Sequence, residues 1–85
     1  SSTNYPSKIN SNVKRALYDN LDNNDDLALQ VDEGIVNYKQ DGWKGNRIKE
    51  KQVKNAIRNA LEEFDIDDEG EVERILKLAK NQNDY

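Results

Sequence analysis

Basic side chains are concentrated in the middle of this chain, between two acidic stretches. The segment carries Lys44, Arg47, Lys49, Lys51, Lys54 and Arg58. Lysines and arginines at this density can contact the phosphates of a nucleic acid. Lys51, Lys54 and Arg58 are spaced i, i+3 and i+7, which places them on one side of a helix. The alternative is a solvated helix face that forms salt bridges within a larger assembly, and the spacing alone leaves both interpretations open.

Trp43, the only tryptophan, lies in a polar loop between Gly42 and the pair Lys44-Gly45. An exposed tryptophan would be a strong anchor for a protein interface. A buried one would close one end of a helical core and donate its ring N–H to a nearby carbonyl. We expect burial, because a domain this small needs every large apolar side chain for its core.

The acidic run that begins at Asp65 matches part of a calcium-binding EF-hand loop. That loop requires oxygen ligands at positions 1, 3 and 5, glycine at 6, an aliphatic residue at 8 and glutamate at 12. Counted from Asp65, all are present except the last, since position 12 is Leu76. Asp67 and Asp68 also suit the positive end of a helix. We therefore predict a helix start here and no metal site.

The composition argues against catalysis by this chain. Its 85 residues carry a net charge of −4 and include no histidine and no cysteine. Those are the commonest general base and the usual zinc ligands. No phosphate-binding glycine loop is present. No apolar run is long enough to span a membrane, and the first residues lack the layout of a signal peptide. We expect a non-enzymatic, cytoplasmic protein without a cofactor or membrane contact.

Helical periodicity predicts an all-α fold with about four short helices and no strand. We expect an N-terminal arm over residues 1–10 and a single helical domain over residues 11–85. Ser11, then Asn24 or Asp25, then Asp67 or Asp68 are the expected N-caps. Gly34 falls inside the second helix, where it either permits close packing or is tolerated. The predicted helices cover residues 12–21, 25–39, 49–64 and 68–80.

Four strings in this order resemble the extreme C-terminus of the restriction (R) subunit of type I restriction-modification enzymes. They are Arg15-Ala16-Leu17-Tyr18-Asp19-Asn20-Leu21, Trp43-Lys44-Gly45-Asn46-Arg47-Ile48-Lys49-Glu50, Val53-Lys54-Asn55-Ala56-Ile57 and Lys80-Asn81-Gln82-Asn83-Asp84-Tyr85. The resemblance runs from about Lys8 to Tyr85. Each string alone is weak, and the specificity comes from their order and spacing.

This resemblance implies a small part of a large DNA-cleaving subunit. The parent carries a nuclease domain and two helicase-type ATPase domains, which use ATP and Mg²⁺, and none of their motifs maps onto this chain. Its helical C-terminal region docks onto the core of methyltransferase (M) and specificity (S) subunits. DNA would be met only through the assembled complex. The candidate interface residues carried over are Trp43, Lys44, Asn46, Arg47, Lys49, Lys54, Asn55 and Tyr85.

The second interpretation is a free-standing binding module. It would use the basic stripe of residues 44–58, with Lys51 and Arg58 added to the candidates, to hold nucleic acid. The salt dependence of DNA binding separates it from the docking interpretation, because every phosphate contact steepens that dependence.

Overall fold

The computed structural model describes residues 4–85. Its four α-helices are α1 (Asn12–Asn20), α2 (Asp25–Tyr38), α3 (Arg47–Glu63) and α4 (Glu69–Lys80). No strand occurs in the described part of the chain. The predicted all-α class is therefore confirmed, and residues 1–3 of the predicted arm lie outside the described residues.

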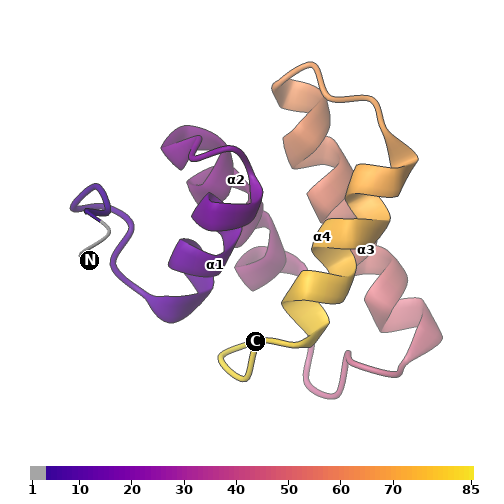
Figure 1. Cartoon of the computed structure of the whole chain (residues 1–85). Coiled ribbons are helices and arrows are strands. Elements are labelled where there is room, and N and C mark those ends of the chain that lie inside the picture. Colours follow the sequence, from indigo (N-terminus) through magenta and orange to yellow (C-terminus); the bar gives the residue numbers. More distant parts are fainter. Residues whose placement is uncertain (1–3) are drawn as a thin grey trace.

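Each helix packs against the next one in the chain, and α1 also contacts α4, so the four helices close into a ring (Figure 1). As a result, α3 is flanked on one side by α2 and on the other by α4. Because two helices pack against α3, only some of its basic side chains reach solvent.

Every helix begins at a side-chain cap. Ser11, Asn24, Asn46 and Asp68 each accept a hydrogen bond from a backbone N–H in the first turn. Such a cap satisfies a donor that the helix itself leaves without a partner. The predicted start of the third helix was two residues late, because Asn46 caps α3 and Arg47 is already helical. Asp68, predicted as helical or as a cap, is the cap of α4.

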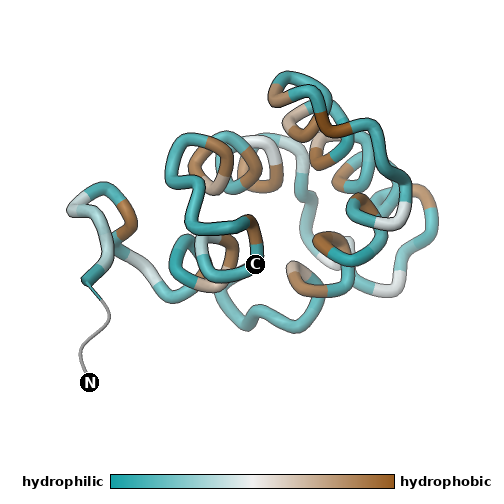
Figure 2. Tube along the Cα trace, turned by 45° about the horizontal axis from the view of Figure 1, so that its top comes forward, coloured by the Kyte–Doolittle hydropathy of each residue, from teal (hydrophilic) through white to brown (hydrophobic). Residues whose placement is uncertain are grey.

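The buried hydrophobic residues form one core cluster to which all four helices contribute, and hydrophobic residues, brown in Figure 2, occur along each helix. Among the described residues no polar or charged residue is buried. Gly34 on α2 lies against Ala56 on α3, and a Cβ there would stand 3.4 Å from the Ala56 carbonyl oxygen. A methyl group at that distance is in ordinary contact, so α2 tolerates Gly34 and the packing does not require it.

The predicted N-terminal arm is partly built into the fold. Ile9 is only 1% exposed and belongs to the core. The Tyr5 ring packs edge-on against Tyr18 of α1, with centroids 5.5 Å apart. Arg15 lies over the same Tyr5 ring. Residues 5–9 thus cover α1.

The acidic run at Asp65 ends one helix and starts another. Asp65 has a positive φ of 61° and follows the C-cap of α3. The Ile66 N–H donates to the Leu61 carbonyl, and the Asp65 N–H donates to the Glu62 carbonyl. This is a Schellman ending, which usually has glycine at the left-handed position. From Glu69 onward the residues are helical, which confirms the predicted helix start.

Candidate interaction surface

Two successive turns place Trp43 between α2 and α3. The Trp43 N–H donates to the Gln40 carbonyl, and the Asn46 N–H donates to the Trp43 carbonyl. Each turn has a glycine at its third position, Gly42 with φ 71° and Gly45 with φ 83°. Positive φ at that position is the mark of a type II turn, in which glycine carries no steric cost. The two glycines thus allow two consecutive turns, and the Trp43 indole between them points into the core.

Trp43 is 3% exposed, as predicted, and it meets the last residue of the chain. Its ring N–H donates to the Tyr85 carbonyl at 3.4 Å. The Tyr85 hydroxyl donates in turn to the Asp32 carboxylate of α2 at 2.5 Å. Trp43, proposed from the sequence as an interface residue, is therefore inside the core and can act on a partner only by shaping the surface above it.

Further contacts tie the segment 41–50 to the C-terminal tail. The Lys44 ammonium donates to the Gln82 carbonyl at 2.6 Å. Lys80 pairs with Glu50 at 3.1 Å, and Glu50 also accepts from the Gly45 N–H. We call this set the junction: Trp43, Lys44, Gly45, Glu50, Lys80, Gln82 and Tyr85. Lys49 braces it by donating to the Asp41 carbonyl at 2.7 Å.

The junction shifts the acidity of two of its groups. The Gly45 N–H, more than the neighbouring Lys80, lowers the pKa of the Glu50 carboxyl. Burial raises the pKa of the Tyr85 hydroxyl far above its usual range, and the hydrogen bond to Asp32 adds to the effect. Both shifts follow the usual rule that donors favour a carboxylate while burial disfavours a phenolate.

The second half of the basic stripe is occupied by acids of α4. Lys54 pairs with Glu73 and, at 3.7 Å, with Glu69. Arg58 pairs with Glu69, and its other guanidinium nitrogen donates to the Asn55 side chain at 2.6 Å. We call the four charged residues the clamp: Lys54, Arg58, Glu69 and Glu73. Lys54 and Arg58 are half-buried, because α4 covers that flank of α3, and their salt bridges form within this chain.

Ion pairing in the clamp also moves pKa values. The hydrogen bond to Glu73 raises the pKa of Lys54, and the hydrogen bond to Glu69 raises the pKa of Arg58. Arg58 in turn lowers the pKa of the Glu69 carboxyl. These three shifts all favour the charged forms of Lys54, Arg58 and Glu69.

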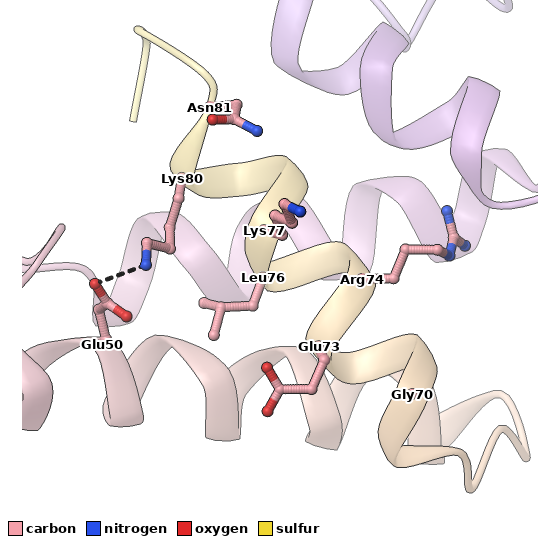
Figure 3. Close-up of a pocket in the computed structure, with 8 residues that line it drawn as sticks. All are labelled: Glu50, Gly70, Glu73, Arg74, Leu76, Lys77, Lys80 and Asn81. Atoms are coloured by element: carbon pink, nitrogen blue, oxygen red, sulfur yellow. Dashed lines mark ion pairs between the residues drawn. The ribbon is translucent and has the colours of Figure 1, made fainter.

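Among the basic candidates on α3, Arg47 and Lys51 are exposed. They line an open depression of about 430 Å³ between α3 and α4. It adjoins a second one of about 640 Å³ along α4, and Glu50, Glu73 and Leu76 line both (Figure 3). We call the two depressions together the α3–α4 groove.

The groove includes basic residues that the sequence analysis did not select. Arg74, Lys77 and Lys80 line it from α4. Their spacing of i, i+3 and i+6 was the available signal, since it places them near one another on a helix. Sequence spacing cannot predict how α4 packs on α3, and this packing is what places the three α4 residues and Arg47 and Lys51 along one groove.

Within residues 4–85 no helix is long and apolar enough to cross a membrane. Among the same residues, no three acidic, histidine or cysteine side chains form a group that could hold a metal ion.

No family model, no curated protein and no solved structure matches this chain. The resemblance to type I R subunits therefore stays a prediction.

Proposed function

We propose that this chain is a non-catalytic helical docking module, and that it forms the C-terminal end of an R subunit of a type I restriction-modification enzyme. In that role it helps seat the subunit on the M–S methyltransferase core in the cytoplasm. ATP, Mg²⁺ and the nuclease chemistry belong to other domains of the parent subunit.

The observation that carries the proposal is the junction. The strings Trp43–Glu50 and Lys80–Tyr85, which carry much of the resemblance, are about thirty residues apart in the sequence. In the fold they meet through the Trp43–Tyr85, Lys44–Gln82 and Glu50–Lys80 contacts. Two of these contacts end on backbone carbonyls of the tail, and the third joins two side chains, so the fold holds both strings at one place.

A second observation favours a docking role over chemistry. The described charged side chains are paired with one another or lie on the surface, and none is buried. Catalytic acids and bases are typically groups whose pKa burial or close pairing has moved toward neutrality. Here the shifted carboxyls, Glu50, Glu69 and Glu71, are shifted further into the charged range.

The experiment is binding of the labelled chain to a preassembled M–S core from the same genome, at low and moderate salt, with and without DNA. We expect binding without DNA that survives moderate salt, since a protein interface does not depend on counterion release. Failure to bind the core under every condition would contradict the proposal.

The second candidate is a nucleic-acid-binding module that uses the stripe of residues 44–58. Arg47 and Lys51 favour it, because both are exposed. Lys44, Lys54 and Arg58 are already committed to the Gln82 carbonyl and to Glu69 and Glu73. This candidate predicts salt-sensitive binding to bare DNA, with a shallow dependence that reflects few phosphate contacts.

A further inference from the structure

The distribution of partners among the basic side chains singles out one surface. All thirteen lysines and arginines lie within the described residues. Most of them pair with a carboxylate, donate to an oxygen or lie over an aromatic ring. Among residues 4–85, Arg47, Lys51 and Lys77 do none of these. All three line the α3–α4 groove, although they come from two different helices.

The groove carries an excess of positive charge on an acidic molecule. Seven basic side chains and two carboxylates, Glu50 and Glu73, line its two parts, and two further acids, Glu69 and Glu71, pair with Arg58 and Arg74. Those carboxylates are already neutralised, Glu50 by Lys80 and Glu73 by Lys54. The chain as a whole has a net charge of −4. A local excess of positive charge on such a background attracts an anionic partner and orients it.

We propose that the α3–α4 groove binds an acidic polypeptide segment of a partner protein, with Arg47, Lys51 and Lys77 as the residues that meet its carboxylates. This inference rests on the proposed docking function and names the surface through which docking occurs. The partner segment carries several aspartates or glutamates together with an apolar side chain.

The floor of the groove favours a polypeptide over a nucleic acid. Glu50 and Glu73 stand between the cations, and a phosphate backbone offers them only further negative charge. A peptide can offer them its N–H groups and place its carboxylates at the cations. Leu76, which lines both parts of the groove, is 8% exposed, so it offers a peptide a small apolar contact that a phosphate backbone cannot use. Protein interfaces combine such an apolar centre with charged surroundings.

The test compares two triple variants that remove the same charge. The groove variant is Arg47→Gln, Lys51→Gln and Lys77→Gln. The control is Lys14→Gln, Arg15→Gln and Lys39→Gln, which also removes one arginine and two lysines but leaves the groove intact. Circular dichroism and thermal melts establish that both variants fold. Each is then titrated against the M–S core, poly-L-glutamate and a DNA duplex.

We expect the groove variant to lose about tenfold or more in affinity for the core and for poly-L-glutamate, because charges across an interface tune association strongly. The control should stay within about twofold of the wild type. Equal binding of the core by the groove variant and the wild type would overturn the inference and leave the docking function standing. So would a groove variant that loses affinity only for the duplex.

The two proposals can fail separately. One possible result is a wild type that fails to bind the M–S core and still binds poly-L-glutamate more tightly than the groove variant does. That result would contradict the docking function and support the groove inference.

Discussion

The junction and the clamp both join α3 to a later part of the chain, yet they differ in what surrounds their polar contacts. The junction encloses Trp43 at 3% exposure and includes Glu50, whose side chain is 18% exposed. In the clamp, Glu69 and Glu73 are more than half exposed. Water screens exposed ion pairs and competes for their hydrogen bonds, whereas contacts that cover apolar surface gain from its burial. Stability should therefore depend on the junction much more than on the clamp.

The largest effect should follow from Trp43→Ala. Deleting a buried tryptophan removes its apolar burial and leaves a cavity, at a cost of about 3–5 kcal/mol. That loss approaches the whole stability of many small domains, about 5 kcal/mol at the low end. Urea unfolding followed by circular dichroism measures the loss. Trp43→Phe is the control, since it keeps a ring and should lose less. If Trp43→Ala unfolded at the same urea concentration as the wild type, the junction would not be the more important of the two regions for stability.

Replacing glycine by alanine should change stability in opposite directions in the junction and in the interior of α2. Gly45→Ala places a Cβ at φ 83°, a conformation that costs an L-residue about 1–2 kcal/mol. Gly34→Ala adds a methyl that fits beside Ala56, and alanine favours a helix interior over glycine by about 1 kcal/mol. Thermal melts should show the first variant less stable and the second more stable than the wild type. Two shifts of the same sign would contradict the assigned roles.

The Tyr85 hydroxyl should give the junction a weakness at high pH. Its pKa is raised in the folded chain, so the unfolded chain releases the phenolic proton first as the pH rises. The stability it contributes is complete below pH about 10 and is lost above that value. Tyr85→Phe should flatten this alkaline decline, and Tyr38→Phe serves as the control, because the Tyr38 side chain is 57% exposed. If the free energy of unfolding of Tyr85→Phe declined with rising pH as steeply as that of the wild type, the Tyr85 hydroxyl would not be the cause of the decline.

The smallest effect should come from the clamp. Glu69→Gln together with Glu73→Gln removes the carboxylate partners of Lys54 and Arg58, which are 27% and 32% exposed, so water can reach both cations and replace those partners. The melting temperature should change little, and any loss should vanish in high salt because salt screens surface pairs. The variant should also bind DNA better than the wild type, since two more cations become available. A large loss of stability that salt does not remove would show that the clamp stabilises the fold as strongly as the junction does, against this prediction.

The helices were predictable because local signals decide them. Caps such as Ser11 and Asp68, and stripes such as Val53, Ile57 and Leu61, act over one or two turns. The bounds agree with the structure to within two residues, and the one late start, at α3, came from overlooking Asn46 as a cap.

The surface was less predictable because it depends on how whole helices pack. A helical wheel places Lys54 and Arg58 opposite the apolar stripe, but it cannot show that α4 lies along that flank. Nor can periodicity show that Tyr85 returns to Trp43 and Asp32. The burial of Trp43 could be predicted from the needs of a small core. The gathering of Arg47, Lys51 and Lys77 at one groove follows only from the way α4 packs on α3.

The most direct test of the docking function is competition. The full R subunit of the same system is mixed with its M–S core while the isolated chain is added in increasing excess, and assembly is followed by native gel or mass photometry. We expect the chain to displace the full subunit from the core, and the destabilised Trp43→Ala variant to displace it less. Assembly that proceeds unchanged at saturating chain would contradict the docking function.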